Sequence, residues 1–92
     1  PNNKVLVLGD MLELGDYSEK AHQEIVDYAS QFQGVTQIFL VGSEFMKTRS
    51  GDLFQKFSSV NELKKEWPKF NWQNQHVFLK GSRSIKLEKL LD

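Results

Sequence analysis

The chain has 92 residues, of which 12 are Lys or Arg and 12 are Asp or Glu, so its formal net charge is zero. This balance argues against a nucleic-acid-binding module and a polybasic membrane-surface segment, both of which carry a basic excess. With 39% apolar residues, no cysteine and no apolar run near the roughly 20 residues that span a bilayer, we expect a folded cytoplasmic domain with no nucleic-acid or membrane partner.

Three short apolar runs predict strands that are buried on both faces: residues 5–8, 38–41 and 77–79. The runs are rich in β-branched and aromatic residues and do not alternate with polar ones. Each ends at or near a glycine (Gly9, Gly42 or Gly81), and a polar residue follows the glycine.

Between the first two runs, residues 16–32 predict an amphipathic helix. Asp16 and Glu19 have the spacing of a capping box, and Gly34 is a candidate stop. The apolar positions expected to face inward are Ala21, Ile25, Tyr28, Ala29 and Phe32.

Further along, residues 45–57 are expected to hold one broken helix. Ser59 and Glu62 repeat the capping spacing at the start of a short helix that Pro68 ends. A last helix is expected over residues 84–91, with Leu87, Leu90 and Leu91 facing inward.

Strands separated by helices indicate parallel βαβ units, so we predict an α/β fold with a Rossmann-like, mostly parallel sheet flanked by helices. A sheet of three strands buries little surface. We therefore expect residues 1–92 to be part of a domain whose first strand precedes residue 1.

Ligands of such sheets bind beyond the carboxyl ends of the strands, where Lys80-Gly81-Ser82-Arg83 is the richest loop. Gly81 permits close approach of a ligand, the amides after it open a helix, and Lys80 and Arg83 are cationic, which together suit a carboxylate or phosphate. A capped helix with two solvated cations explains the same residues.

The loop after the first strand carries Asp10 and Glu13, which suit a ligand site but also a turn and an ion pair. His22, one helical turn after Ser18, is interpreted as a structural hydrogen-bonding residue rather than a ligand, and His76 as a surface residue.

Residues 42–48 end in Lys-Thr, as a phosphate-binding loop does, but they lack the glycine that precedes the lysine in such a loop. The aromatic residues Trp67, Phe70 and Trp72 are expected to pack an irregular connection.

Two motifs resemble the C-terminal domain of the Mur ligases, specifically of the members that add D-alanyl-D-alanine. The first is VLGDMLELG at residues 7–15, followed by Ser18 and His22, and the second is LKGSR at residues 79–83, followed by Leu87 and Glu88. The family's Asp-x-Tyr-Asn-Ala-Asn-Pro run is absent, so the resemblance implies that this domain lacks its first strand and helix.

The resemblance implies an ATP-dependent ligase of peptidoglycan precursor synthesis whose substrates are UDP-N-acetylmuramoyl-tripeptide and D-alanyl-D-alanine, joined through an acyl phosphate. ATP and Mg²⁺ would be bound mainly by the central ATPase domain of the parent chain, so the fragment would be inactive alone and hold no catalytic or metal residue. Carried over by position, the substrate-binding residues are Lys80, Gly81, Ser82, Arg83, Asp10 and Glu13.

Two alternatives without ligase activity stay open: a receiver-like module with Asp10 as phosphoacceptor, and a small anion-binding α/β domain. The receiver would need further acidic residues beside Asp10, where Gly9 and Met11 stand.

Overall fold

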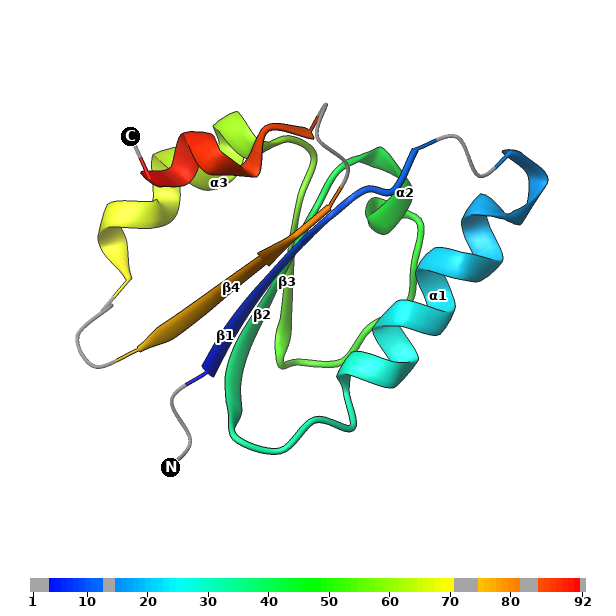
Figure 1. Ribbon diagram of the computed structural model, residues 1–92, viewed down its shortest axis with the longest axis horizontal. Helices are drawn as coiled ribbons and strands as arrows, with labels where there is room; N and C mark the ends of the chain where they lie inside the picture. The colour runs from blue at the N-terminus through cyan, green and yellow to red at the C-terminus, as the bar shows by residue number, and fades with distance from the viewer. Residues whose placement is uncertain (1–3, 13–14, 71–74, 82–84, 92) are drawn as a thin grey trace.

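Four parallel strands form the centre of the molecule in the computed structural model, which describes residues 4–12, 15–70, 75–81 and 85–91 (Figure 1). Within these residues the strands are β1 (Lys4–Gly9), β2 (Val35–Val41), β3 (Phe54–Phe57) and β4 (His76–Lys80), in the order β3-β2-β1-β4. The three predicted strands and the predicted α/β class are confirmed. The prediction that all three are buried on both faces is wrong for β4, because it lies at the edge of the described sheet and Phe78 is 52% exposed.

The strand β3 corrects the expectation of a broken helix over residues 45–57. Only α2 (Ser43–Met46) is helical in this stretch, and β3 pairs with β2 from Ile38–Phe54 to Val41–Phe57. Gly51 and Asp52 interrupt helix formation, and the edge of β2 offers Phe54 both a hydrogen-bonded partner and a buried site.

The long helix α1 (Ser18–Ala29) is shorter than predicted and is turned differently. Its buried positions are His22, Val26 and Ala29, whereas Tyr28 and Phe32, which were expected to face inward, are largely exposed. The predicted capping box is wrong because a 3-10 turn over Gly15–Tyr17 leads into the helix and Tyr17 makes no side-chain cap bond.

The C-terminus of α1 also departs from the prediction. The helix is capped at Ser30 rather than at Gly34, which has a φ of 81° and lies in the turn that leads to β2.

The predicted cap of the second helix is confirmed. In α3 (Val60–Glu66) the Ser59 hydroxyl accepts the N–H of Glu62 at 3.3 Å, and a 3-10 turn over Trp67–Lys69 containing Pro68 follows the helix. The last element is a 3-10 helix over Leu87–Leu91, in which Leu87 and Leu90 are buried as predicted. Among the described residues, every helix is too short or too polar to cross a bilayer.

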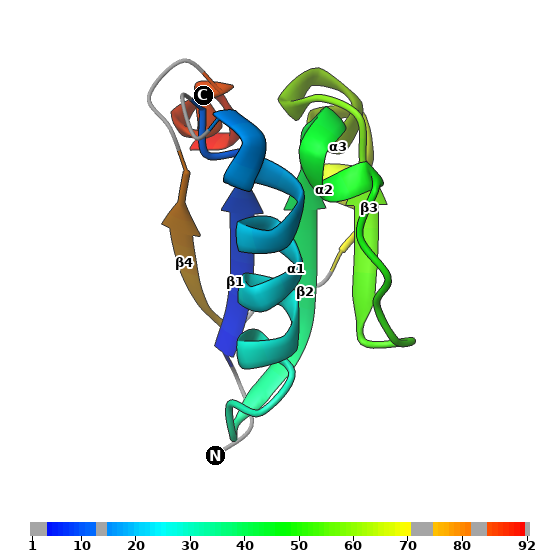
Figure 2. The ribbon, with the colours of Figure 1, turned by 90° about the vertical axis from the view of Figure 1, so that its right-hand side faces the viewer.

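The core lies in two layers, one on each face of the sheet. On one face, Val5 and Val7 of β1 pack with Phe39, Leu63 and the C-terminal 3-10 helix. On the other face, Leu6 and Leu8 pack with the cluster of Ile38, Leu40, Phe45, Phe54, Val26 and Ala29, beneath α1 and α2. Figure 2 looks onto this second face, with α1 in front of β1 and β2. Trp67 and Phe70 pack against Phe39, as expected for a packed connection, and Trp72 lies outside the described residues.

Candidate functional site at the carboxyl edge of the sheet

Asp10 follows β1 directly and is 2% exposed. Its Oδ2 accepts the Glu44 N–H at 2.9 Å and its Oδ1 accepts the Phe45 N–H at 3.0 Å. These amides open α2, so the carboxylate caps a helix on the neighbouring strand's loop and is stabilised by the partial positive charge there. Asp10 therefore has a structural role, as the cap of α2.

Gly42 is required beside this carboxylate. A Cβ on Gly42 would lie 2.2 Å from the Asp10 Cγ, and the Gly42 φ of 122° is a conformation that side-chain-bearing residues rarely adopt. Only glycine therefore lets the loop after β2 close over the end of β1.

His22 is completely buried between the two loops. Its Nε2 accepts the Met11 N–H at 3.0 Å, and its Nδ1 lies 2.6 Å from the Ser18 carbonyl oxygen, which accepts from it. These two partners assign the ring proton to Nδ1. The ring packs edge-on against Phe45, with centroids 4.7 Å apart, so the interpretation of His22 as a structural residue is confirmed.

Glu44 joins α1 to α2 at the rim of this cluster. The Ser18 hydroxyl donates to Glu44 Oε1 at 2.6 Å, and the Lys47 ammonium lies 3.1 Å from Oε2. The Ser18 hydrogen bond, with a smaller contribution from Lys47, holds the pKa of the Glu44 carboxyl below its ordinary value of 4.5. The carboxylate is therefore ionised at neutral pH.

The end of β4 is different in character. Lys80 and Gly81 are exposed, and a Cβ on Gly81 would lie 2.9 Å from the Gly9 Cα. The two glycines let the chain segments that leave β1 and β4 pass in close contact. Of the predicted substrate-binding residues, the structure thus brings Asp10, Lys80 and Gly81 to one edge, and Glu13, Ser82 and Arg83 lie outside the described residues.

A hollow of about 300 Å³ opens at this edge, between the ends of β1, β2 and β3. Its polar lining residues are Asp10, Ser43, Ser58 and Ser59. The complete set of lining residues is Asp10, Leu12, Val41, Gly42, Ser43, Ser58, Ser59, Val60 and Ile85. Hydroxyl groups beside a hydrogen-bonded carboxylate suit a polar ligand.

The sequence analysis did not place Ser58 and Ser59 at this edge because it missed β3, which they follow, although it identified Ser59 as a helix cap. The available signal was the polar pair Ser58-Ser59 directly after the apolar Phe57, which repeats the arrangement of Asp10 after the first strand.

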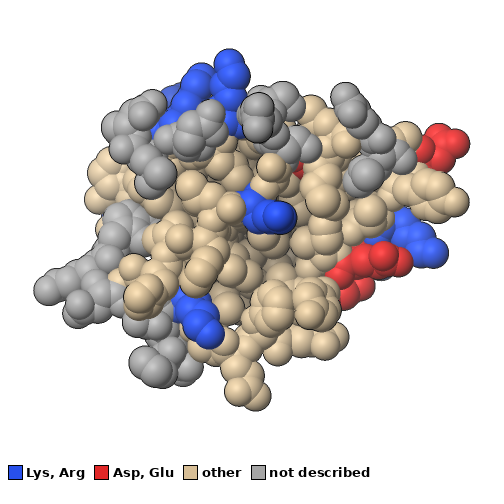
Figure 3. Space-filling model, viewed as in Figure 1, with Lys and Arg blue, Asp and Glu red and all other residues tan. Residues whose placement is uncertain are grey.

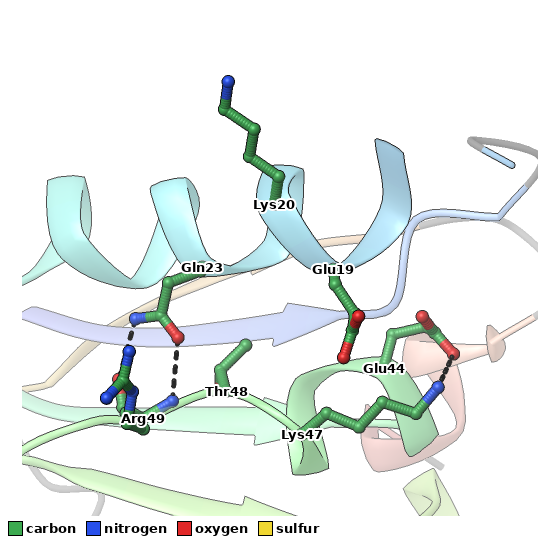
Figure 4. A pocket seen from close by; sticks show the side chains of 7 residues that line it. All are labelled: Glu19, Lys20, Gln23, Glu44, Lys47, Thr48 and Arg49. Atoms are coloured by element: carbon green, nitrogen blue, oxygen red, sulfur yellow. Dashed lines mark hydrogen bonds and ion pairs between the residues drawn. The ribbon is translucent and has the colours of Figure 1, made fainter. Parts of the chain in front are cut away.

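A second hollow of about 260 Å³ lies between α1 and the loop after α2 (Figure 4). The Gln23 side chain bridges it, donating to the Arg49 carbonyl at 2.9 Å and accepting the Arg49 N–H at 2.8 Å. The lining residues are Glu19, Lys20, Gln23, Glu44, Lys47, Thr48 and Arg49. Because its polar groups tie the loop to α1 and its charges are mixed, we assign this hollow a structural role.

Two kinds of arrangement would hold a metal ion or a phosphate in the described part of the chain: a cluster of metal ligands or the Lys-Thr segment. No three His, Cys, Asp or Glu side chains there come together as metal ligands. In the segment with the Lys-Thr ending, the Thr48 hydroxyl donates to the Phe45 carbonyl at 2.6 Å and Lys47 contacts Glu44, so neither is arranged as in a phosphate-binding loop.

Comparison with known proteins shows which proteins this chain is similar to. The chain is 32% identical over 97 residues to the UDP-N-acetylmuramoyl-tripeptide–D-alanyl-D-alanine ligase of Rickettsia prowazekii, covering 99% of this chain and 21% of the ligase. It is 36% identical over 97 residues to the ligase of the same name from Buchnera aphidicola, covering all of this chain and 21% of that protein. No family model matches the chain.

A solved structure agrees with these relatives. The MurF ligase of Thermotoga maritima in complex with ADP superposes with a TM-score of 0.76 and 22% identity, covering 99% of this chain and 21% of that one. The chain thus spans about a fifth of the length of the proteins that it matches. The predicted resemblance is confirmed: this chain is a homologue of one segment of the Mur ligases named for D-alanyl-D-alanine.

Proposed function

We propose that the chain forms the substrate side of the cleft in an ATP-dependent ligase that joins D-alanyl-D-alanine to UDP-N-acetylmuramoyl-tripeptide in peptidoglycan precursor synthesis. The observation that carries this proposal is the match to such ligases over 99–100% of the chain. On this proposal, residues 1–92 are part of the C-terminal domain of a longer polypeptide and have no ligase activity alone.

The loop that begins at Lys80 is our candidate for the site of the dipeptide carboxylate. Lys80 is exposed at the end of β4, and Gly81 keeps that end close to β1. With Ser82 and Arg83, the loop offers cations and a hydroxyl donor, which a carboxylate requires. Arg83 in particular has the donor geometry for two parallel hydrogen bonds to it.

Asp10 and Glu13 belong to the same proposed site, but neither is assigned to the dipeptide carboxylate. The two Asp10 oxygens already accept the amides of α2, so we assign Asp10 the positioning of the loop over residues 42–44 at the hollow. Glu13, three residues further along, is our candidate for the dipeptide ammonium, since a carboxylate is its natural partner.

ATP supplies the phosphoryl group that activates the tripeptide carboxylate as an acyl phosphate. We propose that the parent's central ATPase domain holds ATP and Mg²⁺; the ADP in the solved relative supports a nucleotide site in the whole ligase. The residues of this chain then bind and orient the dipeptide and exclude water from the cleft.

A receiver-like module is not favoured by the geometry. A phosphoacceptor carboxylate must be open to the incoming phosphoryl group, and Asp10 is buried with both oxygens occupied. An anion-binding domain without ligase activity would use the same loop at Lys80, and it differs from our proposal only in forming no product.

The experiment is a steady-state ligation assay of the full-length protein with the Arg83→Ala variant. We expect the Michaelis constant for D-alanyl-D-alanine to rise by about tenfold or more, as for the loss of a charged hydrogen-bonded pair of about 1.5–3 kcal/mol. The matched control is Arg49→Ala, whose site lies on the structural hollow beside α1 and should leave that constant unchanged. An unchanged constant in the Arg83→Ala variant would overturn the assignment of the loop.

A further inference from the structure

The hollow at the carboxyl edge of the sheet has an apolar side to which the proposed function gives no task. Leu12, Val60 and Ile85 line it, and they come from the loop after β1, the start of α3 and the segment before the C-terminal 3-10 helix. Leu12 is 44% exposed, whereas Val60 is part of the core. Ile85 packs on β1, because its Cγ2 lies 3.0 Å from the point that a Cβ on Gly9 would occupy. The sheet and α3 thus hold apolar side chains in position at this hollow.

The polar lining of the same hollow suits an uncharged group. Ser43 and Ser58 are exposed, and a serine hydroxyl can both donate and accept a hydrogen bond. Among the described residues that line the hollow there is no Lys or Arg, and the charged one, Asp10, is an acid. A carboxylate there opposes the entry of a second carboxylate or of a phosphate. Figure 3 shows that the surface over β4 and β1, beside this edge, is also mostly neither acidic nor basic.

The size of the hollow limits what it can take. Its volume of about 300 Å³ is at the lower end of the range of about 300–1,000 Å³ for small-molecule pockets. Hydroxyl groups together with aliphatic side chains match an amide group that carries methyl groups. The charged ends of such a ligand would be bound outside the hollow.

Two of the apolar lining residues are close in sequence to the residues that we assigned to the charged ends of the dipeptide. Leu12 is bonded to Glu13, the candidate for the ammonium, and Ile85 follows Arg83, the candidate for the carboxylate, by two residues. D-alanyl-D-alanine has an amide and two methyl groups between its ammonium and its carboxylate. These uncharged groups are the ones that the hollow suits.

We propose that Leu12, Val60 and Ile85 form a specificity pocket for the methyl-bearing middle of D-alanyl-D-alanine, with the Ser43 and Ser58 hydroxyls toward its amide. This inference rests on the proposed function, because it takes the dipeptide as the amine substrate. It assigns the choice of dipeptide side chain to residues that bind neither charged end. A dipeptide without methyl groups keeps the charged contacts but leaves the apolar side chains of the pocket in water.

The selectivity of the full-length protein between D-alanyl-D-alanine and glycylglycine measures this pocket. In the ligation assay we expect kcat/KM to be at least about tenfold higher for D-alanyl-D-alanine, since one methylene in an apolar pocket changes kcat/KM by about 10- to 200-fold. Leu12→Ala should reduce this ratio by about threefold or more, because it removes part of the apolar lining. A loss of folded protein lowers both constants alike, so a merely structural role would not change the ratio.

Leu53→Ala is the matched control for Leu12→Ala. Leu53 is 37% exposed and directly precedes β3, so it lies at the amino edge of the sheet, away from the hollow. Its replacement should leave the ratio unchanged. A ratio that Leu12→Ala leaves as it was, or an unaltered protein without any preference between the two dipeptides, would overturn the inference.

Ser58→Leu tests the pocket from its polar side. The larger side chain fills the hollow from an exposed position, so we expect the Michaelis constant for D-alanyl-D-alanine to rise by about tenfold and that for ATP to stay unchanged. Ser50→Leu, at an exposed position in the loop before β3, is the control and should change neither constant. An unchanged dipeptide constant in Ser58→Leu would contradict the pocket.

Binding without turnover separates the two proposals. Calorimetry on the full-length protein, with UDP-N-acetylmuramoyl-tripeptide and a non-hydrolysable ATP analogue present, gives the affinities for both dipeptides. An active ligase whose preference does not depend on Leu12 overturns the pocket alone. A protein that forms no product but binds D-alanyl-D-alanine with a Leu12-dependent preference overturns the proposed function alone. A protein that binds neither dipeptide overturns both.

Discussion

The two halves of the carboxyl edge of the sheet are built differently, although all the strands that form it are parallel. At the ends of β1 and β2, a buried carboxylate, a glycine with positive φ and a buried histidine hold each other in fixed positions. At the end of β4, Lys80 and Gly81 are exposed, and Phe78 on the α1 side of the strand is 52% exposed. Similar Gly-polar sequences are therefore buried and hydrogen-bonded at one end of the edge and exposed at the other.

The closed half of the edge, at the ends of β1 and β2, should be destabilised most by Gly42→Ala. The added Cβ would collide with the Asp10 carboxylate at 2.2 Å, in a backbone conformation with a φ of 122°, so we expect a loss of about 3 kcal/mol or more in the free energy of unfolding. Urea denaturation measures it. The matched control is Gly51→Ala, where nothing lies within 4 Å, which should change stability by less than about 1 kcal/mol. Equal losses in the two variants would contradict the account.

Asp10→Asn tests the same half more gently. One carboxylate oxygen becomes an NH₂ group that faces a backbone N–H of α2, so we expect a loss of about 1–3 kcal/mol. Asp52→Asn, at an exposed position before β3, is the control and should stay within about 0.5 kcal/mol. A melt of Asp10→Asn that matches the unaltered chain would show that the cap is not a structural requirement.

Acid should weaken the rim of the closed half through Glu44. Its pKa is lowered in the folded chain, chiefly by the Ser18 hydrogen bond, so its contribution to stability is present above its ordinary value of 4.5 and is lost as pH falls through the lowered value. We expect Ser18→Ala to reduce the drop in urea midpoint between about pH 6 and about pH 3. Ser30→Ala, whose hydroxyl contacts a backbone carbonyl instead, should leave the drop as it was.

The smallest effect on stability is expected in the open half of the edge, at β4. Phe78→Thr removes a half-exposed ring from a strand position that threonine suits, so the unfolding free energy of the 92-residue chain should change by less than about 0.5 kcal/mol. Urea denaturation measures the change, and a loss above about 1 kcal/mol would show that the Phe78 ring is packed as tightly as the closed half of the edge.

The sequence predicted three of the four described strands, each ending near a glycine, because parallel strands of a buried sheet have continuous apolar runs that are visible locally. It missed β3, since only four residues pair there and Gln55 and Lys56 break the apolar run. Such a strand forms because its backbone can pair with the edge of β2, and this tertiary contact is not visible in the local sequence.

The orientation of α1 about its axis was predicted wrongly for a related reason. Its sequence carries two apolar stripes, and periodicity alone does not say which one meets the sheet. His22 was passed over as an inward position because its polar ring weakens the stripe, whereas two backbone hydrogen bonds satisfy it in the core. The tasks of Asp10 and Gly42 also depend on loops more than 30 residues apart, which spacing does not reveal.

The most direct test of the central claim is product formation by the full-length protein. With UDP-N-acetylmuramoyl-tripeptide, ATP, Mg²⁺ and D-alanyl-D-alanine, mass spectrometry should detect the UDP-muramoyl-pentapeptide, and the 92-residue chain should form none. A folded full-length protein that forms no pentapeptide from these substrates would contradict the account.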